Sequence, residues 1–563
     1  MKNKSPSPLP PENAGREEII RWYHRRTKHH FHAFAPGPGR MEWSSQPEEF
    51  RSYGGTEEIG LEIPETRHSI PWKSLFDTDI NTSPLDFRTI SSFLYHSMAI
   101  SAWKRRSGAC WALRVPPSSG NLHPLEAYLA LPAVEGLGDR PAICHYSPPG
   151  HSLERLTRFD EATWRDLTTG LPAGTFFVGI TAIHWRCSWK YGERAWRYCR
   201  LDAGHTLGAL RYAAAALGWG LRLLDVPHQR LAAFLGLPRQ DGLPAHERET
   251  PELLAAVFPN GGSGRMTEAP LPAAAVDRVA GGPWEGTLTT REGRHRDWPV
   301  IERVEEAARP MEGDPGPGPA TEKLAAAKRD GGGGDGPDAL ELVRRRRSAT
   351  GLDRRGTMEA DAFFGLLERL LPLHDPGPWD AMGRAPHIDL HLMIHRVSGL
   401  QPGLYTLVRT AGGRERLAAA MNPEYAWDRP AGCPEQLPLF LNLAGDLTDL
   451  AEGLSCGQEM AGDAVFTLAM TADLEAALAA GGAPAYRRLF QEAGLVGQAL
   501  YLEAEAAGLR GCGIGCYFDD GLHKLLGVDE ERGSQSLYHF VVGRDVPERG
   551  AELLPPYPAP EAR

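Results

Sequence analysis

A short segment of the chain, Pro116–Glu126, combines residue types that could bind a ligand through a rigid turn. It reads PPSSGNLHPLE. Successive Pro, Ser, Gly and Asn residues disfavour a helix, so we expect a fixed loop. Gly120 would let the backbone approach a ligand closely, and the Ser hydroxyls and the Asn121 amide offer hydrogen bonds. From composition alone, an ordinary loop that caps the next element remains an alternative.

A run of arginines, Arg344–Ser348 (RRRRS), opens a helix-like stretch that reaches Leu371. Four guanidinium groups could contact nucleic acid, form a solvated charged face, or hold one phosphate. The chain carries 61 Lys plus Arg against 72 Asp plus Glu, a net charge of −11, which disfavours a nucleic-acid binder. A phosphate held by an arginine fork and a serine hydroxyl is chemically sound.

Three glycines at alternate positions mark Gly511–Phe518, GCGIGCYF. This spacing leaves backbone N–H groups free to meet an anion or the edge of an aromatic ring. It is not a dinucleotide fingerprint, because Cys516 stands where G-x-G-x-x-G requires its last glycine. Two thiols without further ligands do not predict a metal site, and neither do the histidines crowded near the N-terminus, of which His24 and His29 are two.

A lysine lies between two aromatic residues in Trp189-Lys190-Tyr191. Burial beside the rings would depress the pKa of Lys190 and make it a usable base. The alternative is a surface lysine whose stem packs on the aromatic rings.

The elements that would position these motifs occur in two related copies. Segments 195–220 and 485–510 align at a constant offset of 290, with nine of 26 positions identical. Each contains an acidic residue followed by Ala and Gly and then by apolar residues at helical spacing, so each predicts a helix of small residues. Five strand-like runs lie between helical patterns, which indicates a mixed α and β class. These runs are 127–131, 175–183, 387–394, 465–470 and 537–542.

A Gly- and Pro-rich segment divides the 563-residue chain. Twelve of the 28 residues from Met311 to Asp338 are Gly or Pro, which predicts a disordered linker. A short amphipathic helix is expected just before it, over 298–309. We therefore expect an N-terminal domain over 1–260, a partly disordered linker over 261–339 and a C-terminal domain over 340–550.

The overall composition is that of a globular protein, with 42% hydrophobic and 24% charged residues. The sequence shows neither an apolar run of membrane-spanning length nor an N-terminal secretion signal. Eight cysteines without a C-x-x-C pair do not make a disulfide scaffold, so we expect reduced thiols and a cytoplasmic protein without a membrane partner.

Together, the PSSGNLHPLE, RRRRS and GCGIGCYF motifs resemble the nitroreductase superfamily of flavin enzymes. Within it, the chain resembles the tandem proteins of the SagB-type branch, which oxidise azolines in peptide natural products. The resemblance implies an α+β fold of two three-layer α-β-α sandwiches that form an intrachain pseudo-dimer, with FMN between them. Further oligomers are compatible with this arrangement.

The resemblance also implies a role for each motif. The FMN site would take residues from both halves: Pro117, Ser118, Ser119, Gly120 and Asn121 from the first, and Arg346, Arg347, Ser348, Gly513, Ile514, Gly515 and Arg544 from the second. Lys190 and Tyr191 resemble the Lys-Tyr pair that serves catalysis in azoline dehydrogenases. Hydride would pass to the flavin and a proton to a base.

The two halves differ in these motifs. At the 290 offset, Gly513, Ile514 and Gly515 correspond to Leu223, Leu224 and Asp225, so the first half lacks the glycine loop. The second half lacks Pro-Ser-x-x-Asn, and the nearest Arg-Arg-Ser analogue in the first half is Arg25-Arg26-Thr27. We therefore expect one complete composite flavin site per chain and one degenerate site.

Three functions fit this pattern. The first is FMN-dependent dehydrogenation of a peptide-derived or other small substrate. The second is NAD(P)H-dependent reduction of nitro compounds or quinones, in which a nicotinamide rather than the substrate supplies the electrons. The third is a flavin-free binding or scaffold protein derived from the same fold.

Overall fold

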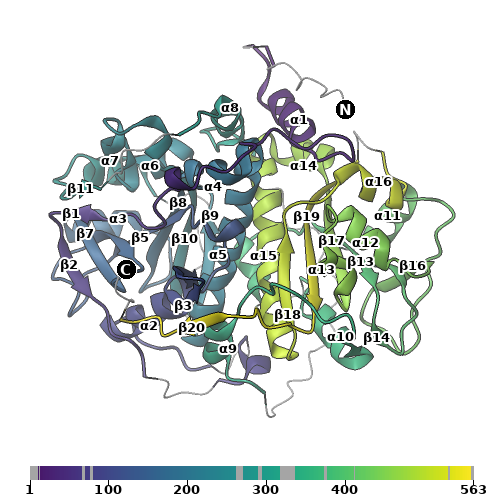
Figure 1. Cartoon of the computed structure of the whole chain (residues 1–563). Coiled ribbons are helices and arrows are strands. Elements are labelled where there is room, and N and C mark those ends of the chain that lie inside the picture. Colours follow the sequence, from purple (N-terminus) through teal and green to yellow (C-terminus); the bar gives the residue numbers. More distant parts are fainter. Residues whose placement is uncertain are drawn as a thin grey trace.

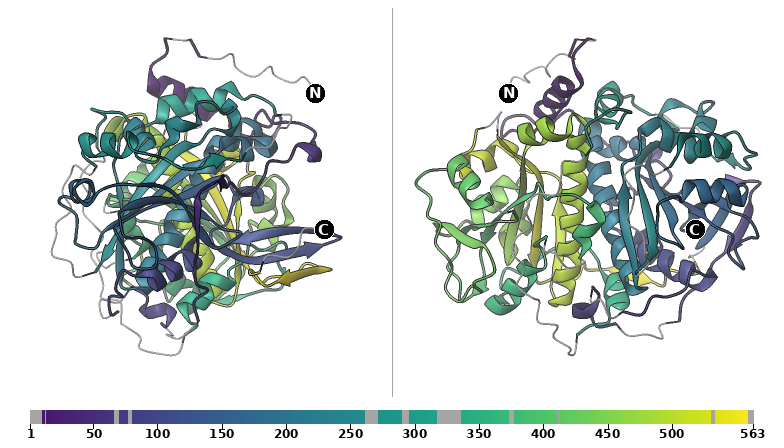
Figure 2. Two further views of the ribbon diagram at one scale, coloured as in Figure 1. Left: turned by 90° about the vertical axis from the view of Figure 1, so that its left-hand side faces the viewer. Right: turned by 180° about the vertical axis from the view of Figure 1, so that it is seen from behind.

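The computed structural model describes residues 10–11, 13–65, 70–76, 80–260, 271–289, 295–316, 336–372, 377–410, 412–529 and 533–558. Two halves lie side by side, and each is built around one large β-sheet (Figure 1). One long helix from each half, α5 (Ala195–Ala216) and α15 (Pro484–Ala506), runs along the middle of the molecule in the front view of Figure 1 and in the rear view of Figure 2.

Within the described residues, the first half contains a seven-stranded sheet of order β2-β7-β6-β5-β8-β10-β9. All neighbouring strands in it are antiparallel. The strands are β2 (Glu57–Gly60), β5 (Leu125–Leu131), β6 (Ala142–Ser147), β7 (Ser152–Arg158), β8 (Phe176–Ala182), β9 (Trp219–Leu224) and β10 (Thr250–Pro259). The strands predicted over 127–131 and 175–183 are confirmed by β5 and β8.

The described part of the second half contains a six-stranded antiparallel sheet of order β16-β15-β13-β17-β19-β18. Its strands are β13 (Asp389–Ile394), β15 (Gly403–Leu407), β16 (Leu439–Ala444), β17 (Phe466–Asp473), β18 (Arg510–Ile514) and β19 (Ser534–Gly543). The predicted strands over 387–394, 465–470 and 537–542 are confirmed by β13, β17 and β19.

The two sheets repeat one plan. The order β5-β8-β10-β9 in the first half corresponds to β13-β17-β19-β18 in the second. In each half a long helix leads directly into the edge strand, α5 into β9 and α15 into β18. The internal repeat at offset 290 is therefore a repeat of architecture as well as of sequence.

Each sheet is covered on both faces because its strands are apolar on both faces. In β5, Ala127 and Leu129 pack into the central core that contains α5 and α15, whereas Tyr128 and Ala130 face the outer helices. The outer helices of the first half are α3 (Glu161–Leu167), α6 (His228–Phe234) and α7 (Ala273–Ala280). Those of the second half are α11 (Gly413–Ala420), α12 (Thr448–Leu454), α13 (Glu459–Asp463) and α16 (Asp519–Leu526). The expected α+β class with three-layer sandwiches is confirmed.

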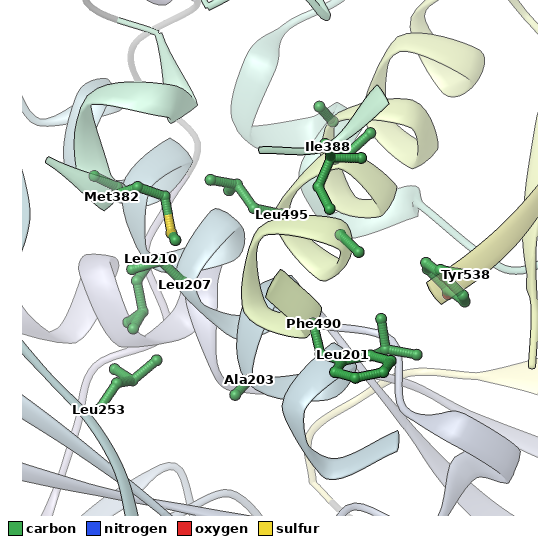
Figure 3. Close-up of a cluster of buried hydrophobic side chains, with 14 of the residues drawn as sticks. Leu201, Ala203, Leu207, Leu210, Leu253, Met382, Ile388, Phe490, Leu495 and Tyr538 are labelled. Atoms are coloured by element: carbon green, nitrogen blue, oxygen red, sulfur yellow. The ribbon is translucent and has the colours of Figure 1, made fainter. Parts of the chain in front are cut away.

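The halves are joined through α5 and α15, whose small residues allow the helices to approach closely. Leu201 and Leu207 of α5 pack in one buried cluster with Phe490 and Leu495 of α15 (Figure 3). Because this cluster is continuous with the inner faces of both sheets, the two halves share one hydrophobic core.

Both chain ends cross to the opposite half. Near the N-terminus, α1 (Arg16–Arg26) reaches α14 (Leu474–Gly481) through the Arg21–Glu475 ion pair, 2.8 Å long. Near the C-terminus, β20 (Ala551–Leu554) pairs with β3 (Ile100–Arg106), which in turn pairs with β4 (Ala109–Arg114). In the side view of Figure 2 the yellow strand accordingly lies beside the blue hairpin.

The remaining described elements are short or connect the sandwiches. They are α2 (Phe87–Ser97), α4 (His184–Tyr191), α8 (Pro299–Ala308), α9 (Ala339–Arg345), α10 (Ala360–Glu368), β1 (Tyr53–Gly54), β11 (Thr287–Leu288), β12 (Met358–Glu359) and β14 (Val397–Ser398). Among the described residues, no helix has both the length and the apolar character needed to cross a membrane.

The expected linker region contains ordered elements at its edges. Helix α8 confirms the amphipathic helix predicted over 298–309 and buries Val300, Ile301 and Val304. Helix α7 also lies within 261–339. Residues 317–335, the centre of the expected disordered segment, lie outside the described residues, so the division at 1–260, 261–339 and 340–550 stays a prediction.

The helix-like stretch expected from Arg344 to Leu371 is wrong. Helix α9 ends at Arg345, and Arg346 has a non-helical backbone with φ −49° and ψ 128°. The chain then pairs with the second sheet, because Ala349 N donates to Gly511 O at 2.9 Å and Asp353 N to Arg544 O at 2.8 Å. These tertiary hydrogen bonds override the helical periodicity until α10 begins at Ala360.

Candidate functional site

A cavity of about 880 Å³ lies between the two halves, and we call it the large cavity. The first half contributes the loop before β5, the end of α4 and one face of α5. The second half contributes the segment after α9, the end of β18 with the following loop, and the C-terminal tail from Asp545 to Leu553. Its volume suits a cofactor-sized molecule.

Most of the predicted site residues line the large cavity. Those that do are Pro117, Ser118, Ser119, Gly120, Asn121, Lys190, Tyr191, Arg346, Arg347, Ser348, Gly513 and Gly515. Two do not. Ile514 is buried in the core of the second half, and the Arg544 side chain is exposed.

The PSSGN loop is fixed by a buried carboxylate on α5. Asp202 accepts hydrogen bonds from Ser118 Oγ at 2.8 Å, Ser119 Oγ at 2.8 Å and Ser119 N at 3.0 Å. Burial raises the pKa of Asp202 to about 7, although these hydrogen bonds act in the opposite direction. Asn121 Nδ2 donates to Ala112 O at 2.9 Å, so the loop is held at both ends.

The arginines after α9 form a buried cationic corner of the large cavity. Arg346 donates to the carbonyls of Val115 and Arg114 at 3.1 and 3.2 Å, which belong to the opposite half. Its Nη1 and the Nε of Arg347 are buried and have no hydrogen-bond partner among the described residues. Burial and then the neighbouring charge of Arg346 lower the pKa of Arg347. Glu505 acts in the opposite direction but does not outweigh these effects, and such crowding of cations is typical of a site for an anionic ligand.

Ser348 and the glycine loop meet at one tyrosine. Ser348 Oγ lies 2.9 Å from Tyr501 Oη, and Gly513 N donates to the same Oη at 3.0 Å. The glycines are required by space: a Cβ on Gly513 would stand 1.7 Å from Tyr538 Oη, and one on Gly515 would stand 2.5 Å from the Tyr198 ring. The wall at this loop is therefore bare backbone packed against aromatic rings.

Lys190 and Tyr191, at the end of α4, lie above the PSSGN loop. A Cβ on Gly120, whose φ is +64°, would stand 2.4 Å from Tyr191 Oη and 3.1 Å from Lys190 Nζ. Lys190 Nζ lies 5.6 Å from the centroid of the Tyr191 ring. Lys190 makes no ion pair within the described part of the chain, and burial lowers its pKa. This environment favours the neutral amine of Lys190 more than water does, which suits a proton acceptor.

The position related by the internal repeat is almost filled. A cavity of about 50 Å³, the small cavity, is lined by Leu223, Asp225, Pro484 and Arg488. At the 290 offset these four residues correspond to Gly513, Gly515, Arg194 and Tyr198, all of which line the large cavity. Asp225 forms ion pairs with Arg384 at 2.9 Å and Arg488 at 3.6 Å, so side chains occupy the space that the other copy leaves open.

Glu492 shows what the second half retains of this arrangement. It is the repeat partner of Asp202, and it accepts hydrogen bonds from the backbone N–H groups of His387 and Ile388 at 2.9 and 3.1 Å. The carboxylate that orders the loop is thus present in both copies. Only in the first copy does the loop held by this carboxylate contain the Ser-Ser-Gly-Asn sequence.

Several wall residues escaped the sequence analysis. Asp202, Tyr501 and Arg510 line the cavity but were predicted only as parts of the repeated segments 195–220 and 485–510. The C-terminal tail reaches the cavity through its pairing with β3 and through Glu548, which forms ion pairs with Lys104 and Arg106. The basic residues of β3 and the acidic residues of the tail could have predicted this contact.

The comparisons with known proteins agree with this architecture. Residues 399–544 match the family model described as "Nitroreductase family". A protein of Methanocaldococcus jannaschii named "Putative nitroreductase MJ1384" is 26% identical over 145 residues, which cover 25% of this chain and 68% of that protein.

A solved structure extends the likeness to both halves. The crystal structure of a "putative nitroreductase" from Anabaena variabilis covers 94% of this chain and 99% of its own, with a TM-score of 0.66 and 20% identity. The E. coli microcin synthetase McbBCD complex, solved with truncated pro-MccB17 bound, covers 36% of this chain with a TM-score of 0.26 and 19% identity. The first of these likenesses shows that the chain has a nitroreductase fold along nearly its whole length.

The resemblance expected from the motifs is thus confirmed at the level of the fold. The SagB-type branch, the flavin and the roles of individual residues stay predictions.

Proposed function

We propose that the chain is an FMN-dependent oxidoreductase with one composite flavin site, the large cavity. One observation carries this proposal: the three motifs line the same cavity. They are distant in the sequence, as Ser118 and Gly513 illustrate. The nitroreductase fold of both halves supports it.

The residues present fit an FMN molecule. The phosphate would be held by Arg346, Arg347 and Ser348, since two guanidinium nitrogens are buried there and have no hydrogen-bond partner in the described part of the chain. The planar ring system would lie against the bare backbone of Gly513 and Gly515 and the PSSGN loop. When bound, FMN would supply the acceptor for a hydride.

The roles of the chain's own residues follow from their positions. Asp202 holds the PSSGN loop in one conformation through Ser118 and Ser119. Lys190 would remove a proton from the substrate, and its lowered pKa keeps a fraction of it neutral. Tyr191 would shield Lys190 from solvent and keep its amine close to the substrate.

The substrate we favour is a small or peptide-derived molecule that is dehydrogenated, as in the SagB-type branch. Lys190 is the observation that favours this over nicotinamide-driven reduction, because removing a proton from carbon needs a base whereas reducing a nitro compound or quinone does not. The first half alone has this Lys-Tyr pair, since the repeat positions in the second half are Ala480 and Gly481.

The decisive experiment is an absorbance spectrum of the purified full-length chain, with the flavin quantified after denaturation. We expect about one FMN per chain, because the large cavity has one counterpart of about 50 Å³ that is too small for a second. Two FMN per chain would contradict the loss of the second site. None, after incubation with added FMN, would favour a flavin-free binding protein.

A further inference from the structure

Two cysteines that the proposed function does not use lie beside the large cavity. Cys516 is part of the cavity wall, and Cys456 lies in the turn between α12 and α13. Both are partly exposed free thiols. Their sequence separation of 60 residues gave no signal that they meet.

Hydrogen bonds fix the two cysteine segments against each other. Phe518 N donates to Leu454 O at 2.8 Å. The Gln458 side chain bridges the segments, since its Nε2 donates to Ser455 O at 2.7 Å and to Cys516 O at 3.0 Å. Two of these hydrogen bonds cross between the segments, so the chain around Cys456 is held directly against the chain around Cys516.

The backbone at Cys456 is itself unusual. Its φ is +56°, in the left-handed region that residues with a side chain seldom adopt. Such a conformation costs on the order of 1 kcal/mol or more, and it persists where the surrounding structure imposes it. Here it lies in the turn that Gln458 links to the Cys516 segment, and the two thiols influence each other's pKa.

A histidine completes the cluster. His29 is anchored on the same segment, because its N–H donates to Asp519 Oδ2 at 3.0 Å and its carbonyl accepts from Asp519 N at 3.2 Å. His29 Nδ1 accepts from Ala35 N at 2.9 Å, so in the neutral ring the proton lies on Nε2. The Cys456 thiol, and after it the His29 ring, lower the pKa of Cys516, whereas the pKa of Cys456 is raised by the Cys516 thiol and by burial.

We propose that Cys516 and Cys456 are a redox-active dithiol that reduces small disulfides entering the large cavity. Cys516 is the nucleophile, because it lines the cavity and lies beside the His29 ring. His29 is a positioning residue that stabilises that thiolate. The proposal does not depend on a bound flavin.

The exchange balances in two steps. The Cys516 thiolate attacks one sulfur of a disulfide RSSR, forms a Cys516–SR mixed disulfide and releases RS⁻. The Cys456 thiol then loses its proton and attacks the Cys516 sulfur, which forms the Cys456–Cys516 bond and releases a second RS⁻. Two electrons pass from the protein dithiol to the small disulfide, which leaves as two thiols.

The test is oxidation of the reduced full-length protein by oxidised glutathione. After acid quenching and alkylation, tandem mass spectrometry locates every disulfide. We expect a Cys456–Cys516 cross-link, with Cys110, which is exposed and lies apart from this pair, giving only a mixed disulfide with glutathione. A wild-type protein that carries glutathione on Cys516 without the cross-link, or that leaves Cys516 unmodified, would overturn the proposal.

Three variants sharpen the result. Cys456→Ser should trap glutathione on Cys516, because the second step is lost. Cys512→Ser, which removes the other cavity thiol of the same peptide, should leave the cross-link in place. His29→Ala should raise the pKa of Cys516, which is about 5 in the wild type, so the pH at which cross-linking reaches half of its maximal rate should move upward by about one unit. An unchanged midpoint in His29→Ala would contradict its role.

Discussion

Gly204 and Gly494 occupy equivalent positions in the internal repeat, and they lie against each other where α5 crosses α15. A Cβ on Gly204 would stand 2.8 Å from Gly494 Cα and 2.0 Å from Gln491 O. A Cβ on Gly494 would stand 2.1 Å from Leu201 O. The two halves are therefore joined backbone to backbone at the pseudo-twofold axis, and the large cavity depends on that approach.

This contact predicts a specific stability loss. Gly204→Ala should lower the free energy of unfolding by about 1–3 kcal/mol, the usual cost of overpacking a tight contact, because the backbone of α15 would have to move away. The control is Gly365→Ala in α10, where a Cβ meets nothing within 4 Å and replacing Gly by Ala should stabilise the helix by up to about 1 kcal/mol. Urea unfolding measures both. Equal losses in the two variants would contradict the close helix contact.

The Asp202 carboxyl predicts a pH dependence of stability. Its pKa in the folded protein is about 7, whereas an unfolded Asp titrates near 4. Between these values the folded state binds more protons, so this group makes stability fall as the pH rises from about 4 to 7. Asp202→Asn removes the titration. The difference between wild type and variant, measured by urea unfolding at each pH, should change across that window, and a constant difference would contradict the raised pKa.

The cationic corner predicts selectivity for the phosphate of FMN. Wild-type protein should bind FMN more tightly than riboflavin, and Arg347→Gln should weaken FMN binding by roughly 10–100-fold, the worth of a charge-assisted hydrogen bond. Riboflavin binding should hardly change. The control is Arg345→Gln, since Arg345 is half-exposed and pairs with Glu505 instead. Fluorescence titration of the three proteins with each flavin gives six affinities, and equal loss for both flavins in Arg347→Gln would place the phosphate elsewhere.

Lys190 separates the two enzymatic proposals. With a thiazoline-containing peptide as the probe, Lys190→Ala should abolish dehydrogenation, while NADPH-driven reduction of an artificial quinone acceptor should stay largely intact. In the wild type, dehydrogenation should increase with pH through a pKa below that of an ordinary lysine, because burial lowers the pKa and the neutral amine is the active form. Product formation is followed by mass spectrometry. Equal loss of both activities would contradict the role of Lys190 as a base.

Much of the fold could be predicted from the sequence because it depends on local periodicity. The five strand runs and the repeated helix have alternating or helical apolar patterns that the tertiary structure preserves. The stretch after Arg345 could not be predicted, because its backbone hydrogen bonds go to Gly511 and Arg544, which are distant in sequence. Local propensity contains no information about such partners.

The same division holds for the site. The PSSGN loop and the glycine loop could be predicted, because their runs of Pro, Ser, Gly and Asn and their spaced glycines are uncommon outside tight turns and ligand-binding loops. Asp202 could not, since its importance comes from facing Ser118 and Ser119 across 83 or more residues. The tail from Asp545 to Leu553 reaches the cavity only through pairing with β3 in the other half. Residues whose role depends on a contact between the two halves are therefore hard to recognise from the sequence of either half alone.

A buried charge network predicts that the expected linker also stabilises the fold. Glu305 of α8 forms ion pairs with Arg200 of α5 and Arg487 of α15, and it accepts a hydrogen bond from Trp196 Nε1 at 2.9 Å. Burial alone would raise the pKa of Glu305, but the two arginines outweigh it and lower the pKa. Arg200 and Arg487 also pair with Glu252 at 2.9 and 3.0 Å, so Glu305→Gln leaves two buried arginines facing one carboxylate and should cost about 3–5 kcal/mol at neutral pH.

The sign of its pH dependence is fixed by the lowered pKa. The folded carboxyl keeps its charge at pH values where the unfolded one is protonated, so its contribution is present above about pH 4 and is lost as the pH falls towards the folded pKa. The control is Glu306→Gln on the same helix, an exposed residue 3.7 Å from Arg309, which should change stability by less than about 1 kcal/mol. Urea unfolding at pH 7 and pH 3 measures both variants. A loss in Glu305→Gln no larger than in Glu306→Gln at pH 7 would mean that α8 is only a tether.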